Sequence, residues 1–126
     1  MKKISTGIKG LIIVQGLKFN DYRGYFREIH KKKIFKKIDL KFWCMSKSKK
    51  GVLRGLHLQL RSLQDKFISV LKGRIIDVVV DLRPESSTFG KHKKIELSEQ
   101  NCKSIFIPAG FAHGFYCRDK ENTIFY

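Results

Sequence analysis

The stretch Arg74-Ile75-Ile76-Asp77-Val78-Val79-Val80-Asp81-Leu82 alternates between two faces with the period of two that is typical of a β-strand. Asp77 and Asp81 share one face with Ile75 and Val79, opposite Ile76, Val78, Val80 and Leu82. In a barrel, carboxylates on such a strand must either meet water at a rim or pair with a cation. We interpret Asp77 as half of a structural ion pair; for Asp81, close to Arg83, a structural and a functional role both remain open.

Short strands separated by turns also describe the rest of the chain. Turn signals such as Lys72-Gly73 and Pro108-Ala109-Gly110 divide it, and only residues 31–40 suggest a short helix. A length of 126 residues fits one domain, 1–126. The pattern therefore predicts an all-β sandwich or jelly roll. The predicted strands cover residues 11–14, 25–29, 41–46, 53–58, 67–71, 74–82, 93–97, 103–107, 112–117 and 123–126.

The chain is strongly basic, with 27 Lys and Arg against 11 Asp and Glu and a formal net charge of +16. Lysines are densest between residues 31 and 50. Such a surface could neutralise nucleic-acid phosphates. However, no nucleic-acid-binding motif accompanies the charge, so we favour a solvated lysine-rich face and expect no nucleic-acid partner. The same field would attract an anionic small molecule.

The cysteines and the apolar runs bear on cellular location. Cys44, Cys102 and Cys117 are odd in number and lack paired spacing, which predicts reduced thiols. The apolar runs are too short to cross a membrane, and the first residues do not resemble a signal peptide. These features predict a cytoplasmic protein without a membrane association.

The segment Gly51-Val52-Leu53-Arg54-Gly55-Leu56-His57-Leu58-Gln59 is the main candidate for chemistry. Arg54 could hold an anionic substrate while His57 moves a proton. On a strand, His57 shares its face with Gln59, and polar neighbours make a purely structural histidine less convincing. His113, which follows a turn and lies among aromatic residues, suits a pocket wall. His30 and His92 lie in lysine-rich stretches and are expected to be solvated.

Two histidines in a small β domain raise the alternative of a metal centre. Metal-binding cupins use a G-x5-H-x-H segment and a later P-x-G-x2-H segment. Here Gly51 and His57 fit the first segment, but Gln59 occupies its second histidine position. Two histidines without a matching carboxylate leave zinc or iron short of ligands. We therefore predict a cupin framework with no metal and no cofactor.

Five motifs follow one another along the chain. They are Arg23-Gly24-Tyr25-Phe26-Arg27-Glu28, the segment from Gly51 to Gln59, Gln64-Asp65-Lys66, Asp77-Val78-Val79-Val80-Asp81-Leu82-Arg83 and Pro108-Ala109-Gly110-Phe111-Ala112-His113-Gly114-Phe115. In this order they resemble the dTDP-4-dehydrorhamnose 3,5-epimerase family. The resemblance implies a metal-free cupin jelly roll, also called a double-stranded β-helix, that usually forms a homodimer. It implies as substrate a dTDP-4-keto-6-deoxy sugar, in the synthesis of rhamnose or related deoxysugars.

The resemblance also implies roles for individual residues. A 4-ketone acidifies the C3 and C5 protons, so a base can form an enolate whose reprotonation from the other face inverts the carbon. His57 would be this base, and Lys66 would stabilise the enolate oxygen. The implied substrate contacts are Arg23 and Arg54 to the diphosphate, Phe26 and Glu28 to the nucleotide, and Gln59, Asp81 and His113 elsewhere in the substrate pocket.

Two departures from the family pattern bear on activity. Phe42 and Cys44 stand where the family has polar substrate contacts. The family's tyrosine acid and the aspartate that orients its histidine are expected beyond Tyr126, which does not match the acid's position. We therefore expect the domain to lack its last strands and to be impaired as an epimerase. Two alternatives remain open: a catalytically weak nucleotide-sugar-binding subunit, and a 3-epimerase or 3,4-ketoisomerase acting on a related nucleotide sugar.

Overall fold

The structure, a computed structural model, describes residues 1–35 and 41–126. These residues form β-strands and one short 3-10 helix, η1, at Lys32–Phe35. No helix in this part of the chain is long and apolar enough to cross a membrane. The strands are β1 (Lys2–Ser5), β2 (Ile12–Gln15), β3 (Lys18–Asp21), β4 (Gly24–Arg27), β5 (Met45–Lys49), β6 (Leu53–His57), β7 (Lys66–Lys72), β8 (Arg74–Asp81), β9 (His92–Ser98), β10 (Lys103–Ile107), β11 (Phe111–Cys117) and β12 (Glu121–Phe125).

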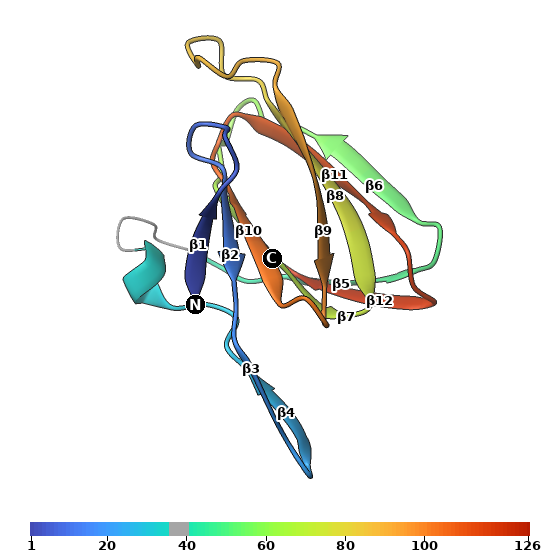
Figure 1. Cartoon of the computed structure of the whole chain (residues 1–126). Helices are drawn as coiled ribbons and strands as arrows, with labels where there is room; N and C mark the ends of the chain where they lie inside the picture. Colours follow the sequence, from blue (N-terminus) through green and yellow to red (C-terminus); the bar gives the residue numbers. More distant parts are fainter. Residues whose placement is uncertain (36–40) are drawn as a thin grey trace.

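Two antiparallel sheets make up the body of the molecule (Figure 1). One has the strand order β1-β2-β10-β7-β12-β5, and the other has the order β6-β11-β8-β9. Their facing sides enclose an apolar core that includes Val70, Ile75, Ile105 and Ile124, all with no exposed surface. This is the jelly-roll architecture that the strand pattern predicted.

The alternation along β8 is observed as predicted. Ile75, Asp77, Val79 and Asp81 face the core and are fully buried, while the intervening residues are only partly covered. β8 lies between β9 and β11, so its polar residues are positioned between two strands rather than at a sheet edge. The buried face of β8 therefore places two carboxylates inside the molecule.

The structure differs from the predicted elements near the N-terminus. β1 and β3 were not predicted, since their residues are mostly exposed and show no alternation of apolar and polar positions. β5 begins at Met45 instead of residue 41. The predicted helix is reduced to η1 in its first half, and residues 36–40 of that prediction lie outside the described residues.

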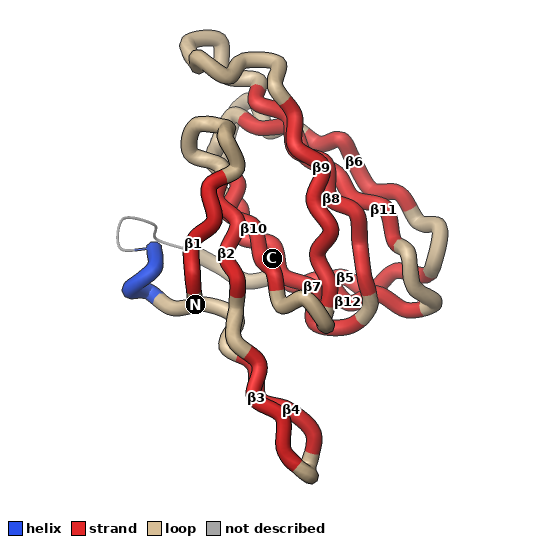
Figure 2. The backbone as a smooth tube through the Cα atoms, in the orientation of Figure 1, coloured by secondary structure: helices blue, strands red, loops and turns tan. Residues whose placement is uncertain are grey.

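The hairpin formed by β3 and β4 extends away from the two sheets (Figures 1 and 2). It exposes aromatic side chains, including Phe19 and Phe26, which are 54% and 66% exposed. At its base, Arg27 Nη1 donates to the carbonyl oxygen of Val70 on β7 over 2.6 Å. Nearer its turn, the Tyr25 hydroxyl donates to Glu99 Oε1 over 2.9 Å, so the hairpin contacts the body of the molecule at two points along β4.

Candidate active site

The predicted base lies next to a second histidine across two paired strands. β6 is the edge strand of its sheet, and its last residue, His57, is exposed. In the β6–β11 ladder, His57 is the register partner of His113, which is 7% exposed. Register partners in antiparallel strands project to the same face. The two imidazoles therefore stand on one side of the sheet, one open to solvent and one enclosed.

Asp77 lies behind His113. Asp77 is fully buried, and its Oδ2 atom is 3.6 Å from Nδ1 of His113. Neither carboxylate oxygen, nor His113 Nδ1, has a hydrogen-bond partner among the described residues. Burial raises the pKa of Asp77, while the adjacent imidazole opposes that shift. Among the described residues, the ionisable group beside Asp77 is therefore the imidazole of His113, not a lysine or an arginine.

Asp81 has a different environment, although it lies on the same buried face. Arg83 donates to it from Nε over 2.8 Å and from Nη2 over 2.7 Å. The hydroxyls of Ser86 and Thr88 each donate to Oδ2 over 2.6 Å. These bonds, led by the one from Arg83, hold the pKa of Asp81 well below its usual range. Of the two roles left open for Asp81, the structure favours the structural one.

A pocket of about 530 Å³ contains the predicted enolate-stabilising residue. Lys66 and Gln59, two residues to which the resemblance gives roles in the substrate site, both line it. Burial lowers the pKa of the Lys66 ammonium, and neighbouring Asp65 partly opposes this. The pocket is lined by Lys41, Phe42, Trp43, Cys44, Gln59, Leu63, Gln64, Asp65, Lys66, Phe67 and Tyr126.

The pocket also contains Tyr126, a residue that the sequence analysis did not place in the site. Its backbone pairs with that of Cys44, with Tyr126 N donating to the Cys44 carbonyl oxygen over 2.9 Å. β12, which precedes it, pairs with both β5 and β7. The last residue of β12, Phe125, pairs with Ser69 in the middle of β7, the strand that begins at Lys66. A phenol thus lies on the same wall as the lysine, and only the strand order reveals this.

Phe42 and Cys44 line the pocket as well, so the two departures noted in the sequence do fall at the candidate site. Trp43 stacks on Phe125 at a ring distance of 4.8 Å. The lining of the pocket therefore combines apolar and aromatic side chains with amide and ammonium groups. All three cysteines are free thiols, as predicted.

The other predicted substrate contacts are distributed over the molecule. Arg54 on β6 donates from Nε to the Ser48 hydroxyl over 3.1 Å. Arg23, at the tip of the hairpin, forms a 2.7 Å ion pair with Asp21, which lowers the pKa of that carboxyl. Within one chain, Arg23 does not lie with the residues that line the pocket.

Phe26 and Glu28 likewise belong to the hairpin region. Phe26 is exposed on β4, and Glu28 forms an ion pair with Lys31 just beyond that strand. None of the predicted nucleotide contacts from this region lines the pocket around Lys66. The predicted site residues therefore fall into two groups, one in the body formed by the two sheets, which we call the barrel, and one in the hairpin region.

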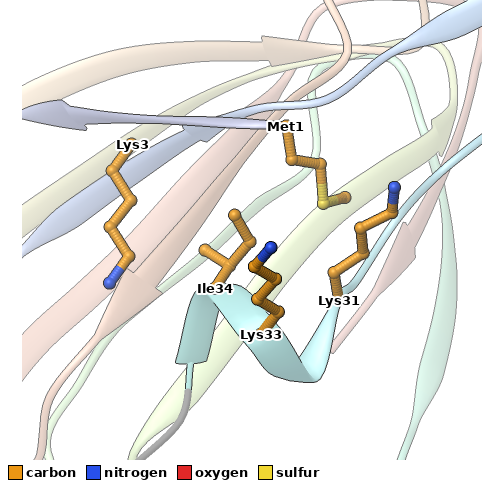
Figure 3. A pocket seen from close by; sticks show the side chains of 5 residues that line it. All are labelled: Met1, Lys3, Lys31, Lys33 and Ile34. Carbon is orange, nitrogen blue, oxygen red and sulfur yellow. The ribbon is translucent and has the colours of Figure 1, made fainter.

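A separate hollow of about 390 Å³, lined mainly by lysines, lies between the N-terminus and η1 (Figure 3). Lys3, Lys31 and Lys33 line it together with Met1 and Ile34. Their ammonium groups point in different directions and do not converge on a common point (Figure 3). This hollow is thus part of the lysine-rich surface.

Within the described ranges, no group of three or more His, Cys, Asp or Glu side chains could hold a metal ion.

Comparison with known proteins gives a consistent set of matches. Residues 5–126 match the family model described as dTDP-4-dehydrorhamnose 3,5-epimerase. The chain is 41% identical to the protein of that name from Methanothermobacter thermautotrophicus and 40% identical to that from Shigella flexneri. The matches span 98% and 100% of this chain, but 69% and 73% of those proteins.

A solved structure agrees with these sequence matches. The crystal structure of dTDP-6-deoxy-D-glucose-3,5-epimerase from Legionella pneumophila, in complex with dTDP-4-keto-L-rhamnose, superposes with a TM-score of 0.93 at 38% identity. The alignment covers 98% of this chain and 69% of that one. The fold and the sequence thus point to the same group of proteins.

Proposed function

The chain belongs to the dTDP-4-dehydrorhamnose 3,5-epimerase family, and on this premise we propose that it inverts C3 and C5 of a dTDP-4-keto-6-deoxy sugar. The observation that carries the proposal is the position of Lys66, whose ammonium is half-buried in a pocket with Gln59 and Tyr126. A cation in a partly dry pocket is suited to stabilise an oxyanion that forms during a reaction.

The reaction needs a base, an oxyanion stabiliser and an acid. His57 takes the proton from the carbon next to the ketone, and the C–H electron pair forms the C=C bond of an enolate. Lys66 stabilises the negative oxygen. Although the resemblance placed the family's acid beyond Tyr126, Tyr126 is the residue with a hydroxyl group among the described residues that line the pocket, and we assign it the delivery of a proton to the opposite face of the carbon. Each cycle leaves the atoms of the sugar unchanged and one centre inverted.

His113 lies next to the base, on the neighbouring strand, and can contact the substrate. It is the register partner of His57, and Asp77 faces its Nδ1 atom. A carboxylate beside one imidazole nitrogen favours the tautomer that carries its proton there, which leaves the other nitrogen as an acceptor. His113 would then accept a hydrogen bond from a sugar hydroxyl beside the reacting carbon.

A homodimer would reunite the two parts of the site. The hairpin carrying Arg23 and Phe26 extends away from the barrel, so these residues are available to the pocket of a second copy (Figure 1). The outer face of the β6-β11-β8-β9 sheet supports such an assembly. Leu53 and Leu56 on this sheet are 69% and 57% exposed, and such apolar surface is typical of protein interfaces.

Solvent exchange tests the proposed chemistry. With dTDP-4-keto-6-deoxyglucose in D₂O, we expect deuterium at both C3 and C5, measured by NMR. His57→Asn should lower the exchange rate by roughly 10²- to 10⁴-fold, since the base is lost. His92→Asn, at an exposed position on β9, is the matched control and should exchange at the native rate.

The pattern of exchange separates the alternatives. Deuterium at C3 alone would indicate a 3-epimerase, and a product ketone at C3 would indicate a 3,4-ketoisomerase. Binding of the nucleotide sugar without exchange at either carbon would contradict the proposal and favour a binding subunit.

Mixed dimers test the proposed assembly. His57→Asn and Phe26→Ala chains should each be nearly inactive alone but regain activity when co-expressed, because one site of the mixed dimer then has both native residues. Light scattering would confirm that dimers form. Dimers that regain no activity would place Phe26 outside the partner's site.

A further inference from the structure

Three side chains at the mouth of the pocket form a hydrogen-bonded chain. Lys66 Nζ donates to Gln59 Oε1 over 3.0 Å, and Gln59 Nε2 donates to Gln64 Oε1 over 2.9 Å. The direction of the chain is determined by chemistry, because an ammonium group can only donate. The Gln59 carbonyl oxygen must therefore face Lys66, and its NH₂ group must face an acceptor, which Gln64 provides.

Lys66 has more free donors than Gln59. Each end of the Gln59 amide already has one partner within the protein, which leaves one N–H of its NH₂ group free. Lys66 has Gln59 as its one hydrogen-bond partner in residues 1–35 and 41–126. Because an ammonium has three donors, Lys66 keeps two of them for a ligand.

The hydrogen-bond partner of Lys66 is the neutral amide of Gln59, and this determines how much of the lysine's positive charge is available to a substrate. The nearest carboxylate in sequence, Asp65, accepts a 2.8 Å hydrogen bond from the backbone N–H of Ala109. An amide oxygen compensates part of the lost hydration of the ammonium without forming an ion pair. The positive charge of Lys66 thus remains available to an oxygen of the substrate.

We propose that Gln59 is a positioning residue that holds the flexible Lys66 side chain toward the pocket, and that Gln64 orients the Gln59 amide for this task. This inference rests on the proposed function, since it assumes that Lys66 stabilises the enolate oxygen. Lysine has a four-carbon stem with many rotamers. A fixed acceptor at its end selects one of them before the substrate arrives.

The first test measures Lys66 in the free protein, by NMR titration of ¹³C-labelled lysine with the signal assigned through Lys66→Arg. Gln59→Met keeps the length of the side chain but removes the acceptor, so the pKa of Lys66 should fall below its native value. Gln64→Met should lower it less. Gln100→Met, at an exposed loop position, should leave it unchanged. Equal pKa values in Gln59→Met and Gln100→Met would overturn the inference.

The second test uses kinetics. Because Lys66 acts mainly on the developing oxyanion, Gln59→Met should lower kcat by about 10²-fold with little change in KM. Gln64→Met, which removes the acceptor of the Gln59 NH₂ group, should lower kcat less than Gln59→Met does. A raised KM with native kcat in Gln59→Met would instead assign Gln59 to substrate binding. If the native chain shows no exchange, the proposed function fails, and the NMR titration still decides the link between Gln59 and Lys66.

Discussion

Asp77 and Asp81 lie four residues apart on the same face of β8, and both have no exposed surface, yet their environments are opposite. Asp81 accepts hydrogen bonds from Arg83, Ser86 and Thr88, and its pKa is lowered. Asp77 has no hydrogen-bond partner among the described residues, and its pKa is raised.

The difference follows from what lies beside each carboxylate. The loop after β8 folds back and supplies Asp81 with donors from its own neighbourhood in sequence. Asp77 is surrounded by other strands, and its polar neighbour is His113 on β11. A buried carboxylate with all its hydrogen bonds stabilises a fold, whereas a buried carboxylate with a raised pKa beside an imidazole is a candidate for a functional role.

The largest expected effect is the loss of the Asp81 carboxylate. Asp81→Ala would leave the partly buried guanidinium of Arg83 and two hydroxyls without their acceptor. Removing one partner of a buried ion pair costs about 3–5 kcal/mol. Urea unfolding should therefore show a much lower midpoint, while Asp119→Ala, which breaks a more exposed ion pair with Arg74, should cost under about 1 kcal/mol. Similar losses in both variants would show that the buried Asp81 ion pair stabilises the fold no more than an exposed one.

Asp77→Asn should affect activity more than stability. Asparagine has nearly the same shape but no charge, so the orientation of His113 would be lost while the core stays filled. We expect deuterium exchange to slow by roughly 10²-fold. The urea midpoint at pH 7 should be unchanged or higher, because the variant no longer buries a carboxylate whose ionisation is unfavourable. Native exchange rates in Asp77→Asn would make this aspartate purely structural.

The smallest expected effect is in the pH dependence of stability, where the two aspartates should act with opposite signs. Asp81 has a lowered pKa, so its contribution is complete above its usual value of 3.8 and is lost as the pH falls through the folded-state pKa. Asp77 has a raised pKa, so between 3.8 and that raised value the folded state binds more protons. Its contribution therefore decreases as the pH rises through this range.

Urea midpoints measured from pH 3 to pH 8 would check these signs. Relative to the native chain, Asp81→Asn should lose part of the decrease in stability at acid pH, and Asp77→Asn should lose part of the decrease above pH 4. One titrating group contributes at most about 1.4 kcal/mol per pH unit. Slopes that change in the same direction in both variants would show that the two sites titrate alike.

Prediction from the sequence worked best where the pattern was local. The alternation in residues 74–82 identified β8 and its inward-facing aspartates. It could not identify the partner of Asp77, because His113 reaches it only through the β8–β11 register. Tyr126 was missed for the same reason, since its place beside Lys66 depends on β12 pairing with two strands. The hairpin strand β3 was missed because it has almost no buried face.

The sequence by itself determined the all-β class, the family and the residue types available for proton transfer, since periodicity and short motifs are properties of neighbouring residues. Only the tertiary structure decided which of two similar aspartates is structural, which amide holds Lys66, and that the hairpin contacts lie apart from the pocket. The physical reason is that pKa values, hydrogen-bond directions and pocket walls depend on distances between strands. The order and register of those strands are established only when the two sheets pack around a common core.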